Sequence, residues 1–238
     1  MRGFSPLSSH PGRGLKPRVA FTEICLRLRL AGNIRADLVR RLIRLVLWTW
    51  FLAALIVGRF DLLRNLPGAV LPGLLCGLAV LLLAACFGFP SLRAWLKTVD
   101  LRVLVLLHVS RLIGYASLVL YHRGQLPYAL AVPGGWGDII VAVLALAVVF
   151  LPMRAALRQR ACIIWNTFGF VDILLLVATA VRLGFTQPWQ LGAWRRLPCC
   201  MLPTFLVPLI IATHVIIYVR LRVPTDTASP PADRPADA

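Results

Sequence analysis

Long apolar stretches separated by short polar segments run through most of the chain. Six of these stretches approach or exceed the roughly 18 residues that mark a helix able to cross a bilayer. They predict an all-α integral membrane bundle of six transmembrane helices within residues 42–222. The expected spans lie near 42–58, 68–89, 101–121, a fourth stretch ending at 151, 161–181 and 201–219. A basic N-terminal tail, 1–41, and a disordered C-terminal tail, 223–238, complete this organisation.

The fourth stretch departs from a regular helical pattern. Pro133 and three glycines fall within Pro133–Gly137, which predicts a break followed by a helix that restarts at Asp138. A helix from Asp138 to Phe150 is only about 18–20 Å long, against about 30 Å of hydrocarbon core. We therefore expect a short or broken fourth span whose irregular backbone is buried or lines a wet cavity. A tilted span with an exposed loop is the alternative. In the sixth span, Pro203 and Pro208 predict a bend.

Composition supports the membrane class and excludes an ordinary soluble domain. Hydrophobic residues make up 59% of the chain and charged residues 15%, whereas ordinary globular domains carry about 25% charged residues. The net charge of +17 would suggest nucleic acid in a soluble protein. Here the basic residues gather in the tail and short loops, where membrane topology and anionic lipid account for them. We expect a lipid bilayer as the partner and no nucleic acid.

The distribution of basic residues also predicts the orientation. With the N-terminus inside, the inner segments hold 19 Lys and Arg residues and the outer loops hold 6. Both termini are therefore predicted to be cytoplasmic. The Arg- and Ala-rich composition is compatible with a GC-rich bacterium, so we expect a multi-pass protein of the bacterial inner membrane.

Catalytic and metal signatures are missing from the sequence. The six cysteines match no zinc or redox spacing, and Cys199-Cys200 is a vicinal pair near an expected interface that could bind a soft metal or be oxidised. The chain contains a single glutamate, Glu23, and no HExxH or GxSxG motif. Nothing here favours an enzyme or a metal centre, and the sequence names no cofactor.

Arg111 is the least ordinary residue, because it lies near the middle of the third span. An arginine at that depth is costly and normally faces a partner or a cavity. Asp172, at a similar depth in the fifth span, is its expected partner, and Asp138 is a second candidate. Two alternatives stay open: Asp138 as a helix N-cap, and Arg111–Asp172 as a purely structural clip between helices.

Two histidines are expected at a common depth. His108 lies one turn below Arg111, on one face with Tyr115 and Leu118, and His214 falls in the same layer of the sixth span. This layer could ligate haem, relay protons, or consist of hydrogen-bonded structural histidines. Asn166, Gly169 and Asp172 recur every three residues along the fifth span. Because Asn166 falls near the histidine layer, we expect a polar seam through the third, fifth and sixth spans.

Several short motifs resemble one group of proteins. They are Arg111-x-x-Gly114, Gly124-x-Leu126-Pro127, the segment from Pro133-Gly134-Gly135-Trp136-Gly137 to Asp138, Trp165-Asn166 and Asp172. This pattern is similar to that of an uncharacterised group of bacterial polytopic membrane proteins. The resemblance implies a membrane location and supplies no activity.

The functional hypothesis with most support is a small transporter-like protein. Its substrate or proton would meet Arg111, Asp138 and Asp172, with Asn166 nearby, and an anion would suit the arginine and a helix N-terminus. One alternative is a haem-binding or redox subunit that uses His108 and His214. Another is an accessory or assembly subunit whose intramembrane charges bind a membrane partner.

Overall fold

The computed structural model describes residues 17–222, and the chain divides into two units, one ending at Arg44 and one beginning at Leu45. The predicted C-terminal tail, 223–238, and the first part of the predicted N-terminal tail, 1–16, lie outside the described residues.

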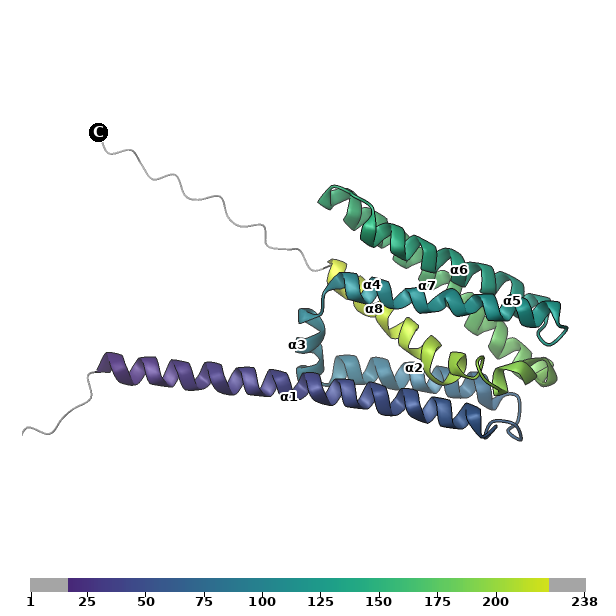
Figure 1. Ribbon diagram of the computed structural model, residues 1–238, viewed down its shortest axis with the longest axis horizontal. Helices are drawn as coiled ribbons and strands as arrows, with labels where there is room; N and C mark the ends of the chain where they lie inside the picture. Colours follow the sequence, from purple (N-terminus) through teal and green to yellow (C-terminus); the bar gives the residue numbers. More distant parts are fainter. Residues whose placement is uncertain (1–16, 223–238) are drawn as a thin grey trace, which may run out of the picture. The chain divides into compact units, whose positions relative to one another are not determined.

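Every regular element in the described range is a helix (Figure 1). In chain order they are α1 (Pro17–Arg59), α2 (Val70–Gly88), α3 (Pro90–Thr98), α4 (Leu101–Leu107), the 3₁₀ helix η1 (His108–Ile113), α5 (Gly114–His122), α6 (Tyr128–Phe150), α7 (Ala155–Thr186), the 3₁₀ helix η2 (Pro188–Arg195), the π-helical turn η3 (Leu202–Leu206) and α8 (Val207–Arg222).

Six segments within residues 17–222 are helical, long enough and apolar enough to cross a membrane. They are Asp37–Arg59, Val70–Gly88, Leu101–His122, Tyr128–Phe150, Ala155–Thr186 and Leu202–Arg222. The predicted all-α class and the six apolar helices are confirmed. Leu202–Arg222 is the span most enclosed by protein: 72% of the residues in its most apolar 18-residue stretch are buried, against 11–33% in the other five spans. The sixth span is therefore the centre of the second unit.

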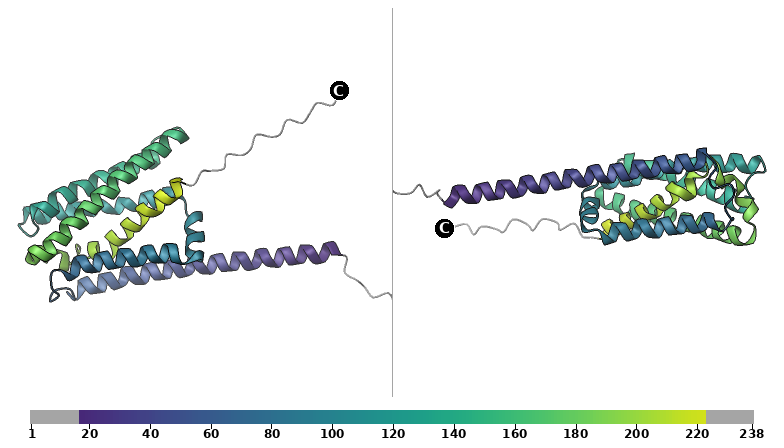
Figure 2. Two further views of the ribbon diagram at one scale, coloured as in Figure 1. Left: turned by 180° about the vertical axis from the view of Figure 1, so that it is seen from behind. Right: turned by 90° about the horizontal axis from the view of Figure 1, so that it is seen from below.

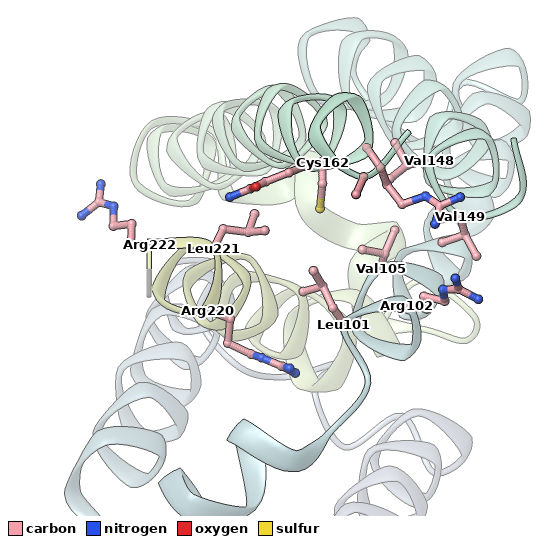
Figure 3. A pocket seen from close by; sticks show the side chains of 12 residues that line it. Leu101, Arg102, Val105, Val148, Val149, Cys162, Arg220, Leu221 and Arg222 are labelled. Atoms are coloured by element: carbon pink, nitrogen blue, oxygen red, sulfur yellow. The ribbon is translucent and has the colours of Figure 1, made fainter. Parts of the chain in front are cut away.

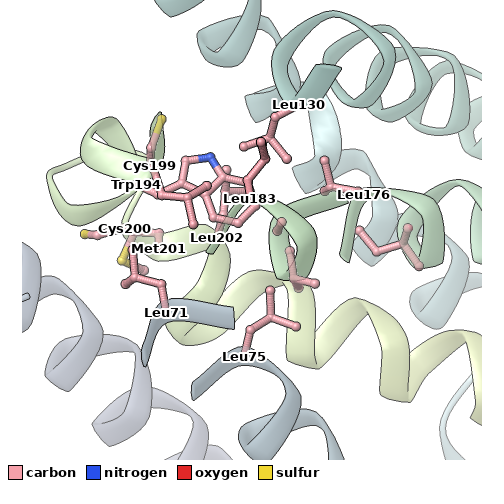
Figure 4. Packing of buried hydrophobic residues seen from close by; sticks show 14 of the residues in the cluster. Leu71, Leu75, Leu130, Leu176, Leu183, Trp194, Cys199, Cys200, Met201 and Leu202 are labelled. Carbon is pink, nitrogen blue, oxygen red and sulfur yellow. The ribbon is translucent and has the colours of Figure 1, made fainter. Parts of the chain in front are cut away.

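Packing in the second unit joins helices that are distant in sequence. α6 packs against α5 and α7, and α8 packs against α2 and α7 (Figures 1 and 2). One apolar cluster includes Leu130 of α6 and Ile173 of α7, and Figure 4 shows part of it around Trp194. A second cluster includes Val141 of α6 and Trp165 of α7. The stretch of each helix between these positions carries the polar site described below.

The predicted break in the fourth span is wrong. α6 is one helix of 23 residues that contains Pro133, about 35 Å long. Pro133 removes one backbone hydrogen bond near the start of the helix. The helix nevertheless continues, because its glycines pack against α5 on one side and α7 on the other. Gly134, Gly135 and Gly137 are buried against neighbouring helices, as small residues are where membrane helices approach closely.

The irregular backbone lies in the third and sixth spans instead. In the third span, the 3₁₀ helix η1 separates α4 from α5. In the sixth, Pro203 lies within the π-helical turn η3 and Pro208 lies just after it. The Trp50 indole N–H donates to the Thr204 carbonyl over 2.9 Å, the acceptor that an α-helical N–H at Pro208 would otherwise serve. This bond fastens the second half of α1 to the sixth span.

Candidate functional site

Arg111 is completely buried and bonded through all three guanidinium nitrogens. Nε donates to Oδ1 of Asp138 over 2.6 Å, and Nη1 donates to the carbonyl of Gly169 over 3.0 Å. Nη2 forms an ion pair with Oδ2 of Asp172. Both aspartates named from the sequence thus contact Arg111, and the three side chains come from η1, α6 and α7.

The 3₁₀ winding of η1 explains why Arg111 points inward with its neighbours. A 3₁₀ helix has three residues per turn, so side chains three apart are eclipsed on one face. His108 and Arg111 of η1, and Gly114 directly after it, are buried along this row, and Ser117 of α5 is buried as well. Tyr115, which α-helical geometry placed on the same face, is instead 67% exposed.

Glycines let the three helices approach at this level. A β-carbon on Gly114 would lie 2.6 Å from Cβ of Asp138 and 2.8 Å from the carbonyl oxygen of Gly135. A β-carbon on Gly137 would overlap the carboxylate of Asp172. The glycines that suggested a break therefore let α5 and α7 reach the face of α6 that carries Asp138.

Asp138 is not a helix N-cap. It lies ten residues after Tyr128, the first residue of α6, or about 15 Å along the helix, and it is only 5% exposed. A buried carboxylate requires a partner, and Arg111 is that partner. Asp172 is less enclosed, with 17% of its side chain exposed.

His108 and His214 lie together next to this site. Their ring centroids are 4.2 Å apart and both side chains are completely buried. Nδ1 of His214 lies 2.8 Å from Oδ1 of Asn166, and the Asn166 amide donates to the backbone carbonyl of His214 over 3.1 Å. His108 Nε2 lies 3.2 Å from the Thr213 hydroxyl.

This arrangement does not fit haem ligation between the two histidines. Axial ligands stand on opposite faces of a porphyrin with the iron between them. Here the rings contact each other directly, and the Trp165 ring lies 5.0 Å from that of His108 and 5.9 Å from that of His214. There is no space between the rings for a haem plane.

One nitrogen of each histidine, Nδ1 of His108 and Nε2 of His214, is buried without a hydrogen-bond partner in the described part of the chain. A buried polar atom without a partner calls for an explanation, such as a water or a transferable proton. Gly169 lies between the Arg111 cluster and the two histidines. Its carbonyl accepts from Arg111, and a β-carbon on it would lie 3.3 Å from His214 Nε2.

Thr213 was not singled out from the sequence, although it bonds His108. It follows an apolar run and precedes His214. Only the rotation of the sixth span about its own axis could have shown that Thr213 faces the third span. The π-helical turn alters that rotation.

Cys199 and Cys200 are buried free thiols outside the spanning segments (Figure 4). Burial, with a smaller contribution from Cys200, raises the pKa of Cys199 to about 11. Burial also raises the pKa of Cys200. Both shifts favour the neutral thiol over the thiolate, which is the form that binds soft metals. The described residues include no group of three or more His, Cys, Asp and Glu side chains that could hold a metal ion.

Comparison with known proteins places these residues in a family. No curated protein and no solved structure matches the chain. Residues 69–222 match the domain of unknown function DUF8737, a range that runs from the start of α2 to the end of α8 and includes the whole Arg111 site. The chain therefore belongs to the DUF8737 family.

Proposed function

We propose that this protein is a small transporter-like membrane protein that uses Arg111, Asp138 and Asp172 as a proton-binding site. The observation that carries the proposal is the sharing of one buried guanidinium between two carboxylates on different helices.

The charges in this cluster do not balance. One cation faces two anions in a buried site, so the fully ionised cluster has a net charge of −1. An uncompensated buried charge is costly, and one proton on either aspartate removes it. An arginine–carboxylate pair held only as a structural clip needs a single aspartate. The second aspartate gives the site a group that can gain and lose a proton.

The histidine layer supplies a continuation for that proton. Arg111 bonds Gly169, Gly169 lies against the His214 ring, and the His214 ring contacts His108. Imidazole is the side chain suited to passing protons near neutral pH. In this proposal the two histidines relay protons between the aspartates and the end of the bundle that carries Arg102 and Arg220.

An anionic substrate at Arg111 is not proposed. All three guanidinium nitrogens are engaged by the protein, and the N-terminus of α6 is remote from the site. The internal pairing also argues against a role in which Arg111 binds a partner subunit.

Proton flux into vesicles tests the proposal. Purified protein is reconstituted with an internal pH-sensitive dye, and a potassium diffusion potential is imposed with valinomycin. We expect flux above that of empty vesicles, reduced to the empty-vesicle rate by Asp138→Asn or Asp172→Asn. Infrared spectra over a pH series should show one protonated carboxyl band in the wild type that these variants change.

The matched control is Asp100→Asn. Asp100 accepts from the backbone N–H of Arg102 at the start of α4, a role that asparagine also fills. The proposal would be contradicted if the wild-type protein gave the same flux as empty vesicles. It would also be contradicted if Asp138→Asn, Asp172→Asn and Asp100→Asn all gave the wild-type flux.

The proposal includes a bacterial inner-membrane location with both termini in the cytoplasm. The excess of basic residues in alternate segments supports this orientation. Alkaline phosphatase fused after Arg222 is expected to be inactive, and fused in the loop after Arg123 to be active. The opposite pattern would reverse the orientation.

A further inference from the structure

A pocket of about 710 Å³ lies where the ends of four spanning segments meet, those of α4, α6, α7 and α8. Its volume is within the range of about 300–1,000 Å³ that is usual for sites that bind small molecules. Leu101, Val105 and Leu221 project into it, with Val148 and Cys162 across from them (Figure 3). The interior is therefore apolar.

The polar part of the lining is basic, apart from the neutral Gln159. Four arginines, Arg102, Arg158, Arg220 and Arg222, line the pocket, and no carboxylate is among its lining residues in the described chain. The nearest acid along the sequence, Asp100, accepts from the backbone N–H of Arg102. Four arginines thus contribute to the lining of an apolar interior, and no acid among the described lining residues compensates their charge.

The arginines differ in how far the protein already uses them. Arg220 donates to the backbone carbonyls of Leu96 and Val99, so it holds the junction of α3 and α4. Arg158 makes one bond of 3.3 Å to the Leu151 carbonyl, while its Nε is buried with no partner in residues 17–222. The guanidinium of Arg102 makes no hydrogen bond or ion pair with the described residues. Arg102 and Arg158 therefore have unused donors.

We infer that this pocket binds one anionic phospholipid, with an acyl chain in the apolar interior and the headgroup phosphate at Arg102 and Arg158. The charge pattern selects this occupant. A small soluble anion would leave the apolar interior unfilled, and a lipid without net charge would leave the arginines without a counter-charge. Basic pockets between membrane helices on the cytoplasmic side are a known setting for anionic headgroups, and the orientation predicted from the loops puts this end of the bundle there. The inference does not rest on the proposed transport activity.

Native mass spectrometry of the full-length protein in a non-ionic detergent tests the inference. Phosphatidylglycerol and phosphatidylcholine with identical acyl chains are titrated separately. We expect one phosphatidylglycerol to bind at least about tenfold more tightly than phosphatidylcholine, and Arg102→Gln/Arg158→Gln to weaken it about tenfold. Arg154→Gln/Arg160→Gln, which removes the same charge from exposed positions outside the pocket, should change it by less than about twofold.

A second variant covers failure of the double variant to fold. Val149→Trp fills the apolar part and leaves every arginine in place, and it should exclude the bound phosphatidylglycerol. Inorganic phosphate at millimolar concentration should not displace the lipid. The inference would be overturned if the two lipids bound equally well, or if the two double variants lost the same affinity. It would also be overturned if Val149→Trp retained the lipid, or if phosphate displaced it.

Discussion

Gly114 and Asp138 face each other across the α5–α6 interface so closely that a β-carbon on the glycine would lie 2.6 Å from Cβ of the aspartate. The position of the carboxylate beneath Arg111 therefore depends on the absence of a side chain one turn further along the third span. The ion pair and the close helix packing are two aspects of one contact.

Gly114→Ala is predicted to destabilise the protein by about 1–3 kcal/mol, the usual cost of an extra methyl group in a tightly packed interior. The new methyl group must push Asp138 or the Gly135 backbone away and lengthen the bond to Arg111. The free energy of unfolding in mixed detergent and SDS, followed by circular dichroism, measures this loss.

Gly77→Ala is the matched control for that change. Gly77 lies within α2, and a β-carbon on it would meet nothing within 4 Å. Alanine favours a helix over glycine by about 0.5–1 kcal/mol, so this variant is expected to be as stable as the wild type or more so. Equal losses at both positions would show that tight packing at Gly114 is not the cause.

The same glycines show where the sequence was sufficient and where it was not. Apolar length predicted six helices because bilayer thickness imposes that length whatever the partners are. Local propensity predicted a break at Pro133–Gly137, although α6 continues through it. What holds that backbone is contact with Gly114, Leu118, Asp172 and Leu176 on other helices, which no local pattern contains.

The 3₁₀ stretch illustrates the same limit at the site. Counting depth along the spans placed Arg111 and Asp172 at one level, with Asp138 as a second candidate partner at the predicted helix restart, and Arg111 contacts both aspartates. The rotation of the third span was predicted with α-helical geometry and was wrong for Tyr115. A run of small and polar residues every three positions, His108, Arg111, Gly114 and Ser117, is the signal that could have indicated the tighter winding.

Trp50→Phe is predicted to cost about 1 kcal/mol, the usual net value of one hydrogen bond. The variant leaves the Thr204 carbonyl without the indole donor that replaces the missing N–H of Pro208. In a Pro208→Ala background the same change should cost less, because the restored backbone N–H can serve that carbonyl. The difference between the two costs is measured by unfolding in SDS.

Trp48→Phe is the control for Trp50→Phe, made with and without Pro208→Ala. Trp48 is 62% exposed, and its indole makes no hydrogen bond with the described residues, so its replacement should leave stability unchanged in both backgrounds. A Trp50→Phe cost that is the same with and without Pro208 would mean that the indole does not compensate for the proline.

Alkylation of Cys199 is predicted to be suppressed at pH 8 and to increase with pH up to about pH 11. The thiolate is the reactive form, and burial raises the pKa of Cys199 from 9.0 to about 11. The thiolate population at pH 8 is therefore about a hundredfold below that of an ordinary thiol. Iodoacetamide labelling followed by peptide mass spectrometry measures the rate.

A Trp189→Cys variant supplies the exposed reference for the same experiment, because Trp189 is 71% exposed in the nearby helix η2. Its thiol should react rapidly at pH 8, and denaturation in SDS should bring Cys199 to the same rate. Equal rates for the two thiols in the folded protein would rule out the burial described here.

Replacement of Arg111 by Met separates the structural role of the ion pairs from their proposed role in proton binding. Arg111→Met leaves two carboxylates buried without their cation, and breaking a buried pair in this way costs about 3–5 kcal/mol. Arg111→Met/Asp138→Asn/Asp172→Asn removes all the charges, and it should recover most of that stability because an uncharged, well-packed replacement is often neutral. Unfolding in SDS gives both values.

Proton flux in the triple variant then discriminates between the two roles. It is predicted to equal that of empty vesicles even though the protein is folded, because no carboxylate remains to bind a proton at this depth. Arg111→Lys keeps the charge but lacks the planar fork that reaches three acceptors at once, so it should retain part of the stability. A stable triple variant with wild-type flux would leave Arg111 and its aspartates as a structural clip and nothing more.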